Sequence, residues 1–206
     1  MYETILSWRC SEENSAAYNL AMNPLVISCS LNPDSRSAGL ARQAHESFSK
    51  ASGGARLIDL RQTPLPVCDG GPTYQHENVE PLAAAISQAD PILLAVPVYN
   101  YYGNAAAKNL IELTGRAWTG KVVGFMCAAG GQGSYMSVMS LANSLMLDFR
   151  CLIVPRFVYA TGEHFDEDGS LNETIARRTE ELCDAAAGLA RAWEQAKVSP
   201  GHAGSN

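Results

Sequence analysis

Residues 91–113 hold an uncharged apolar run, then a loop with three tyrosines, then a helix-like segment. The run at residues 91–96 is typical of a strand buried on both faces of a parallel sheet. Pro97 is expected to end this strand, because proline has no N–H for a sheet ladder. The loop at residues 98–104 would then follow a strand and precede a helix that starts at Ala105. Ligands of open α/β sheets bind at that place, so the loop is a candidate site. The alternative is a surface loop whose tyrosines pack on neighbouring elements.

The same alternation of strand and helix patterns repeats along the chain. Strand candidates lie at residues 25–28, 55–60, 91–96, 121–128 and 151–160. Within the last of these, Pro155 predicts a bulge or an edge position. Such alternation predicts parallel strands joined by right-handed crossovers, with helices on both faces. We therefore expect an α/β three-layer sandwich around a five-stranded parallel sheet in the order 2-1-3-4-5.

The length of 206 residues and a hydrophobic content of 47% fit one large domain with its own core. We expect this domain at residues 24–196. Residues 1–23 have mixed polarity and are expected to be an extension outside the core. Residues 197–206 contain proline and glycines and are expected to be a flexible tail.

Charge and cysteine content exclude several classes of function. The net charge is −6 without a basic stripe, which argues against nucleic-acid binding. No apolar stretch approaches the roughly 20 residues that cross a bilayer. The six cysteines form no C-x-x-C pair and the four histidines are scattered, so no metal site is expected. Reduced thiols and the lack of a signal-peptide pattern predict a cytoplasmic protein.

A polar loop follows the first strand candidate and precedes a helix pattern. Within eight residues it carries three hydroxyls and an amide, on Ser30, Asn32, Ser35 and Ser37. These groups and the free N–H groups at the positive end of a helix dipole suit a dianionic phosphate, and Arg36 could add charge. The loop is neither a Walker A nor a G-x-G-x-x-G motif, which favours a monophosphate. Asp34 is expected to point outward or to contribute only its backbone. The alternative is a cluster that caps the helix.

A glycine loop follows the fourth strand candidate at the same sheet edge. Gly130, Gly131 and Gly133 would let the backbone approach a ligand closely, with Gln132, Ser134 and Tyr135 adding contacts. The alternative is a tight turn into the next helix. The order 2-1-3-4-5 places the loops after the first and third strands side by side. Three such loops suit a ligand with a phosphate at one end and a flat heteroaromatic ring at the other, and FMN has this shape.

Three motifs in this order resemble a known family. They are S-x-N-P-x-S-R-S at residues 30–37, P-V-Y-N at 97–100 with A-A-K-N-L at 106–110, and G-K-V-V-G…A-A-G-G-Q-G-S at 120–134. Over about residues 24–193 the chain resembles the NAD(P)H-dependent FMN reductases of the flavodoxin-like fold, including the flavin reductases of alkanesulfonate systems. Ala105 stands where many members have a glycine. The resemblance implies FMN as cofactor and NADPH or NADH as co-substrate.

The resemblance also implies a role for each matching residue. Ser30, Asn32, Ser35 and Ser37 would hold the FMN phosphate. The isoalloxazine ring would lie along Pro97, Val98, Tyr99 and Asn100, and its pyrimidine edge would meet Gly130, Gly131 and Gln132. Tyr101 and Tyr102 would shape the nicotinamide side or pack against another subunit. Family members are usually homodimers or homotetramers, and residues 64–74 are a candidate for a wall between subunits.

The expected chemistry is hydride transfer from the nicotinamide to the flavin, without a catalytic acid–base residue of the protein. Three functions remain open. The enzyme could release reduced FMN to a flavin-dependent monooxygenase. It could retain FMN and reduce a small-molecule acceptor, such as a quinone, an azo dye or a metal oxyanion. It could also be a non-enzymatic FMN-binding electron carrier.

Overall fold

The computed structural model describes residues 22–166 and 169–198. The central strands are parallel, in the order β2 (Arg56–Asp59), β1 (Leu25–Ser28), β3 (Ile92–Tyr99) and β5 (Val122–Ala128). The place beyond β5 is shared by β6 (Leu152–Ile153) and β7 (Val158–Ala160), which both pair with β5. The predicted order 2-1-3-4-5 is confirmed, although the sheet has seven strands rather than five. Residues 1–21 and 199–206, predicted as extension and tail, lie outside the described residues.

The predicted strand at residues 151–160 is interrupted in its middle. β6 pairs with Val122 and Val123, whereas β7 pairs with β5 only from Met126 onward. Pro155 lies in the gap, where its missing N–H cannot continue the ladder. The break displaces Arg156 and Phe157 from the sheet and leaves both side chains at least partly accessible.

Two expectations for the third strand are wrong. β3 runs through Pro97, which pairs with Ala128 of β5, and ends only at Tyr99. Backbone groups alternate sides along a strand, and the Ala95 carbonyl already accepts from Cys29 on the β1 side (2.9 Å). The missing N–H of Pro97 therefore falls on that side, beyond the last residue of β1, and costs the ladder nothing.

The predicted loop at residues 98–104 is a β-hairpin. β4 (Tyr102–Gly103) pairs antiparallel with the end of β3. The two turn residues, Asn100 and Tyr101, have φ angles of 51° and 65°, as in the tight two-residue turns that hairpins favour. The sequence lacks the usual Asn-Gly signal, because a tyrosine holds the second turn position.

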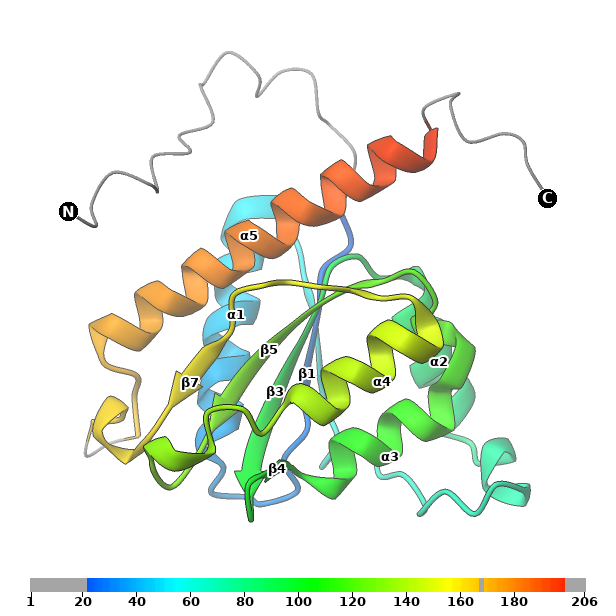
Figure 1. The fold of residues 1–206 in the computed structure, drawn as a ribbon, viewed down its shortest axis with the longest axis horizontal. Helices are drawn as coiled ribbons and strands as arrows, with labels where there is room; N and C mark the ends of the chain where they lie inside the picture. Colours follow the sequence, from blue (N-terminus) through cyan, green and yellow to red (C-terminus); the bar gives the residue numbers. More distant parts are fainter. Residues whose placement is uncertain (1–21, 167–168, 199–206) are drawn as a thin grey trace.

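Two helical layers enclose the sheet (Figure 1). One face is covered by α1 (Arg36–Ser52) and α5 (Glu173–Val198), and the other by α2 (Val79–Gln88), α3 (Ala105–Thr114) and α4 (Met139–Phe149). Short 3-10 turns lie at Pro72–Gln75, Gly115–Trp118, Gln132–Ser134 and Gly162–His164. The predicted three-layer sandwich is confirmed. Residues 197–198 belong to α5 rather than to a tail.

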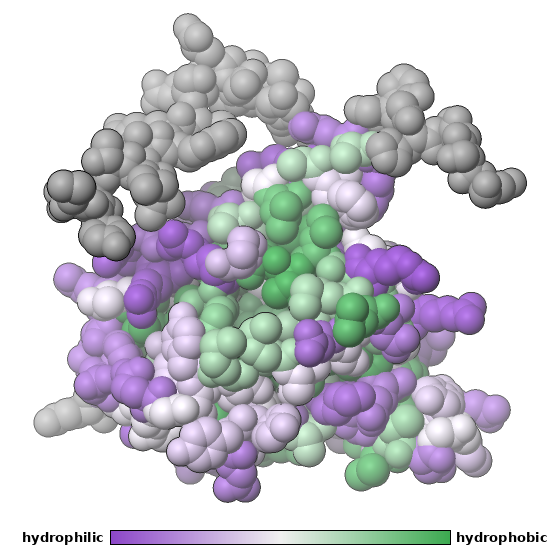
Figure 2. Space-filling model, viewed as in Figure 1, coloured by the Kyte–Doolittle hydropathy of each residue, from purple (hydrophilic) through white to green (hydrophobic). Residues whose placement is uncertain are grey.

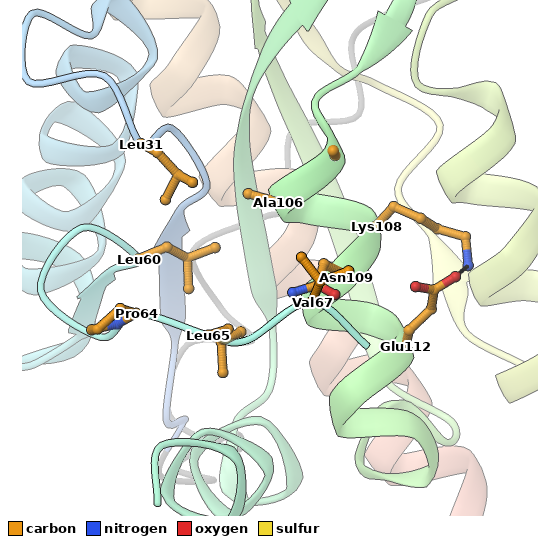
Figure 3. A pocket seen from close by; sticks show the side chains of 10 residues that line it. Leu31, Leu60, Pro64, Leu65, Val67, Ala106, Lys108, Asn109 and Glu112 are labelled. Atoms are coloured by element: carbon orange, nitrogen blue, oxygen red, sulfur yellow. Dashed lines mark hydrogen bonds and ion pairs between the residues drawn. The ribbon is translucent and has the colours of Figure 1, made fainter. Parts of the chain in front are cut away.

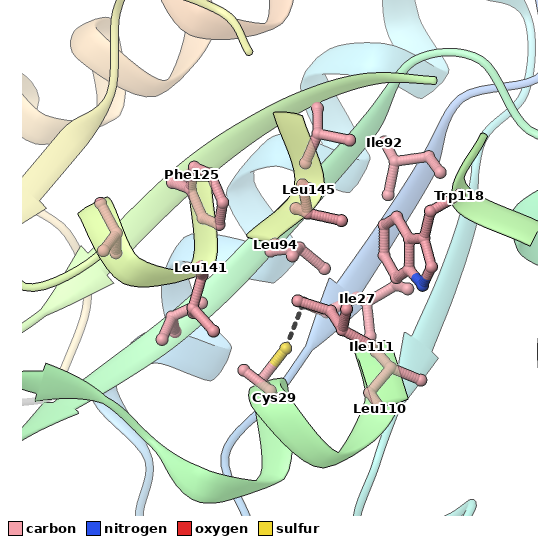
Figure 4. Close-up of a cluster of buried hydrophobic side chains, with 14 of the residues drawn as sticks. Ile27, Cys29, Ile92, Leu94, Leu110, Ile111, Trp118, Phe125, Leu141 and Leu145 are labelled. Atoms are coloured by element: carbon pink, nitrogen blue, oxygen red, sulfur yellow. Dashed lines mark hydrogen bonds between the residues drawn. The ribbon is translucent and has the colours of Figure 1, made fainter. Parts of the chain in front are cut away.

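The core between the sheet and α2, α3 and α4 holds the strand ends in place (Figure 4). Ile27, Leu94 and Phe125 of the strands pack there with residues of α3 and α4, and Trp118 is fully buried. Burial of each large side chain contributes about 1.5–3 kcal/mol. The core also contains Cys29, whose pKa is raised to about 12 by burial, so this thiol stays neutral.

Candidate functional site

Two adjoining cavities open between the loops at the carboxyl edge of the sheet. The serine cavity, about 370 Å³, lies among the β1–α1 loop, β3 and the end of β5. The hairpin cavity, about 540 Å³, lies between the β3–β4 hairpin and the glycine loop. Both are lined by Val98, Tyr99 and Gly130, so they form one continuous site. Every predicted site residue except Gln132 lines this site: Ser30, Asn32, Ser35, Arg36, Ser37, Pro97, Val98, Tyr99, Asn100, Tyr101, Gly130 and Gly131.

The serine loop, residues 29–37, is ordered by its own hydrogen bonds. Ser30 and Ser37 are buried, and the Asn32 N–H donates to Ser30 Oγ (3.2 Å). Ser35 is the N-cap of α1: its Oγ accepts from the Ala38 N–H (3.3 Å) and shares a hydrogen bond with Ser37 Oγ (2.9 Å). The N–H groups of Arg36 and Ser37, the first two of α1, have no partner within the helix and remain as donors at the wall of the serine cavity.

Charged groups surround the serine loop. Arg36 lines the cavity and its guanidinium lies 5.5 Å from the ring centre of Phe165. Asp34 is exposed, and its N–H donates to Asn32 Oδ1 (3.0 Å), as an Asx-turn requires. Asp34 nevertheless lines the serine cavity together with the hydroxyls. Arg36, the open helix end and the hydroxyls favour an anion in this cavity, and the Asp34 carboxylate opposes one.

Arg61 supports this loop from outside and was missed by sequence reasoning. It forms an ion pair with Asp59 at the end of β2, and its Nη1 donates to the Pro33 carbonyl (2.9 Å). The hydrogen bond from Arg61 is the main cause that holds the pKa of Asp59 below its ordinary value. No motif could have indicated this contact, since it depends on the pairing of β1 with β2.

Asn104 joins the serine loop to the hairpin. Its side chain is 6% exposed, and Nδ2 donates to the Cys29 carbonyl (2.7 Å). The Asn104 N–H also donates to the Pro97 carbonyl (3.0 Å), which closes the base of the hairpin. The hairpin is further held by the Gly103 N–H, which donates to the Ser137 carbonyl (3.2 Å). A Cβ on Gly103 would lie 2.8 Å from Leu141 Cδ1, so glycine permits this close approach.

The glycine loop is fixed from below by a buried tyrosine. The Tyr159 hydroxyl donates to the Gly131 carbonyl (2.6 Å) and shares a hydrogen bond with Ser134 Oγ (2.9 Å). Gln132 turns away from both cavities, and its Nε2 donates to Glu163 Oε1 (2.9 Å). Its side chain is therefore engaged elsewhere, and only its backbone remains near the site. Hydrogen bonds from Thr161 and Gln132 keep the pKa of Glu163 below its ordinary value.

A third cavity, about 400 Å³, shares no lining residue with the other two (Figure 3). This apolar groove lies between α3 and the irregular segment at residues 61–71, with Leu31, Leu60 and Leu65 on one side. Asn109 of α3 ties the segment down, since its Oδ1 accepts from the Cys68 N–H and its Nδ2 donates to the Pro66 carbonyl (both 2.8 Å). The role of residues 64–74 at a subunit interface stays a prediction.

The continuous site fits FMN. One end offers hydroxyl and N–H donors for a phosphate, and the other offers aromatic side chains and backbone. Gly130 and Gly131 line the wall, and a Cβ at either position would meet no protein atom within 4 Å, so it would only occupy space that a ligand can use. Each cavity falls in the range of about 300–1,000 Å³ usual for small-molecule sites. Within the described residues, no three His, Cys, Asp or Glu side chains are grouped to hold a metal ion.

Comparison with known proteins identifies relatives of similar chemistry. An NAD(P)H-dependent FAD/FMN reductase of Geobacillus thermodenitrificans is 28% identical over 124 residues, which cover 59% of this chain and 67% of that protein. An NADPH:quinone oxidoreductase of Arabidopsis thaliana is 27% identical over 172 residues, which cover 76% of this chain and 87% of that protein.

A solved structure shares the fold. The flavoenzyme NAD(P)H:(acceptor) oxidoreductase FerB from Paracoccus denitrificans superimposes with a TM-score of 0.67 at 21% identity, covering 85% of this chain and 98% of that chain. Residues 22–166, well over half of the chain, match the family model described as NADPH-dependent FMN reductase. The chain therefore belongs to the NADPH-dependent FMN reductase family.

Proposed function

We propose that this protein is an NAD(P)H-dependent oxidoreductase that binds FMN along the carboxyl edge of its sheet and reduces it. The observation that carries the proposal is the continuity of the two cavities through Val98, Tyr99 and Gly130. One molecule with a phosphate at one end and a flat ring at the other can occupy both. The family membership and the chemistry named for the relatives agree with this activity.

The serine loop would hold the phosphate of FMN. The hydroxyls of Ser30, Ser35 and Ser37 and the first N–H groups of α1 converge on one cavity, and the helix dipole favours an anion there. Arg36 would balance part of the charge of a dianion. Asn32 contributes mainly to the shape of the loop, because its Oδ1 already accepts from the Asp34 N–H.

The hairpin and the glycine loop would hold the ring. Pro97 to Tyr101 form one wall, and Gly130 and Gly131 form the other. Backbone N–H groups of Gly131 and Gln132 are candidates to stabilise negative charge at the pyrimidine edge. When bound, FMN supplies the chemistry of accepting a hydride and passing on electrons, and the protein supplies orientation and electrostatics. No acid–base residue of the chain is required.

We also infer an assembly of several copies. Exposed apolar side chains include Met136, Met139 and Leu147 around α4, and Val67 at the apolar groove. Figure 2 shows hydrophobic residues gathered near the middle of the face on which α4 lies, with hydrophilic residues around them. Such patches mark protein–protein contacts in many proteins. A homodimer or homotetramer would cover them, which light scattering after size-exclusion chromatography can test.

The five cysteines of the described part of the chain are free, which favours a reducing compartment such as the cytoplasm. No helix in that part is long and apolar enough to cross a membrane.

The electron acceptor separates two candidate functions. In the first candidate function, the enzyme releases reduced FMN to a flavin-dependent monooxygenase. In the second candidate function, the enzyme retains FMN and reduces a quinone, and the names of the plant relatives favour this function.

The proposal is tested with purified protein in two measurements. Titration of FMN should quench its fluorescence, and a colourless protein without quenching would contradict FMN binding. NAD(P)H oxidation that rises with added free FMN indicates a flavin reductase. Oxidation that depends on a quinone and ignores free FMN indicates the retained-flavin enzyme. Bound FMN without any NAD(P)H oxidation would leave only an electron carrier and would overturn the enzymatic proposal.

A further inference from the structure

A cationic cavity of about 510 Å³ lies next to the hairpin cavity and has no part in the FMN site described above. Its charged lining consists of Arg156, Arg177, Arg178 and Glu181. The sequence did not indicate this cluster, because Arg156 is more than 20 positions from the pair on α5. The fold brings them together: the break at Pro155 displaces Arg156 from the sheet edge, and the second turn of α5 carries the other two.

The charges of this cavity are unbalanced. Glu181 is its single carboxylate, and it pairs with Arg156 and, at 2.8 Å, with Arg177. These pairs orient the two guanidinium groups. Arg178 forms no ion pair within residues 22–166 and 169–198. Three cations around one carboxylate leave a net positive site, which suits an anion of at least two negative charges.

Aromatic rings line the same cavity. The ring of Tyr135 lies 4.8 Å from that of Phe157 and 5.4 Å from that of Tyr159, measured between centroids. Tyr135 is about half exposed, so one part of its ring is free to pack against a ligand. Guanidinium groups beside aromatic rings favour a ligand that joins a phosphate to a flat base.

The cationic cavity adjoins the hairpin cavity at the end of the glycine loop. Ser134 lines the hairpin cavity and Tyr135, the next residue, lines the cationic cavity. Tyr159 lies beneath both and binds Ser134 and the Gly131 carbonyl. A long ligand that reaches the FMN ring through the hairpin cavity can therefore extend over residues 134–135 to the arginines.

We propose that this cavity binds the adenosine end of NADPH, with the 2′-phosphate on Arg178 and its two arginine neighbours. The inference rests on the proposed function, because it assigns the nicotinamide end of the same molecule to the hairpin cavity. It adds the residues that distinguish NADPH from NADH. NADH lacks the 2′-phosphate and would leave the arginines without a dianion, so NADPH is the preferred co-substrate.

The test measures binding of adenosine 2′,5′-bisphosphate, which carries the 2′-phosphate but no nicotinamide. Isothermal titration calorimetry of the FMN-loaded protein should show that the bisphosphate binds about tenfold more tightly than 5′-AMP. Its affinity should fall as salt is raised, because the contacts are ionic. In the R178A variant the preference over 5′-AMP should disappear.

The R191A variant is the matched control. Arg191 is on the same helix and lines a different cavity, beside Asn23 and Asp90, that shares no lining residue with the cationic cavity. R178A should raise the KM for NADPH about tenfold while the KM for NADH and the FMN affinity change less than about twofold. R191A should change none of them.

Several results would overturn the proposal. They are equal affinity for the bisphosphate and 5′-AMP, an equal effect of R178A on NADPH and NADH, and an effect of R178A on oligomeric mass instead of nucleotide binding. A protein that binds FMN and oxidises NADPH yet ignores the bisphosphate keeps the proposed function and loses this inference. A protein that binds the bisphosphate but not FMN loses the proposed function, and with it the assignment of this cavity to NADPH.

Discussion

The two ends of the FMN site are built differently. The serine loop is held by hydrogen bonds among its own residues, and Ser30 and Ser37 are buried. The hairpin projects three tyrosines that are each more than half exposed, and it turns through two residues at positive φ. One end is thus ordered by its own hydrogen bonds, whereas the other is shaped by strain and by contact with α4. If the serine loop holds the phosphate, as proposed above, then phosphate binding and adaptation to the ring should be separable by mutation.

The S35D variant tests the serine loop and has the largest expected effect. Aspartate is as good an N-cap as serine, so α1 should keep its stability. A negative charge beside the phosphate should cost about 3 kcal/mol at an effective dielectric constant near 20. The Kd for FMN should therefore rise about 100-fold.

Riboflavin, which has no phosphate, separates this effect from a general loss of binding. Its affinity should be the same in S35D and in the unmodified protein. The S35N variant, with a neutral cap, should lose far less FMN affinity than S35D. If S35D binds FMN normally, the phosphate does not lie at the serine loop.

The N104A variant tests the connection between the two ends. Asn104 donates to the Cys29 carbonyl in a buried place, and alanine would leave that acceptor without a partner. The free energy of unfolding should fall by about 2 kcal/mol, and the FMN affinity should fall with it. Urea denaturation with and without FMN measures both.

N109A provides the comparison for that variant. The Asn109 side chain makes two hydrogen bonds to a distant segment at the apolar groove, whereas the Asn104 side chain makes one, to Cys29. N109A should lose similar stability and keep its FMN affinity. Equal loss of FMN affinity in both variants would mean that Asn104 acts only through global stability.

Y101G tests the strain of the hairpin. Tyrosine at φ 65° costs roughly 1 kcal/mol that glycine would not, so the free energy of unfolding should rise by up to about 1 kcal/mol. N100G should change stability less, because asparagine accepts this conformation. Thermal unfolding of the two variants distinguishes them. A destabilised Y101G would show that contact of the Tyr101 ring with the glycine loop at Gly133 outweighs the strain.

Most of the fold was predictable from local sequence patterns. The features that the sequence did not predict depend on tertiary contacts. Buried runs and the Ser35 cap are encoded within a few residues, so the strand order and the start of α1 were predictable. The hairpin was missed because Pro97 reads as a strand end, although its missing N–H falls where β1 has already ended. Asn104, Arg61 and Arg156 each contact a partner that lies 25 or more positions away in the sequence, and only the folded sheet brings these partners together.

 The contact of Arg61 with Pro33 spans 28 positions and that of Asn104 with Cys29 spans 75, so no local pattern announces either.

The side chain of Gln132 shows the same limit. The motif places it in the glycine loop, but the fold offers Glu163 and Thr161 as partners on the far side of that loop. Which way a loop side chain turns depends on the neighbouring strand connection, and that information lies outside the motif.

The smallest expected effect concerns the support of the serine loop by Asp59 and Arg61. The pKa of Asp59 is held below its ordinary value, chiefly by the hydrogen bond from Arg61, so the pair stabilises the folded state above the ordinary aspartate pKa of about 3.9. This contribution should be lost as the pH falls through the lowered pKa of the folded protein. Because the pair is partly exposed, D59N should lower the free energy of unfolding by only about 0.5 kcal/mol at pH 7. Urea titrations at pH 7 and at acid pH should show this difference shrinking, and an R61Q variant should behave alike. A difference that grows in acid would mean that Asp59 is stabilised in its protonated form and that Arg61 supports the loop through Pro33 alone.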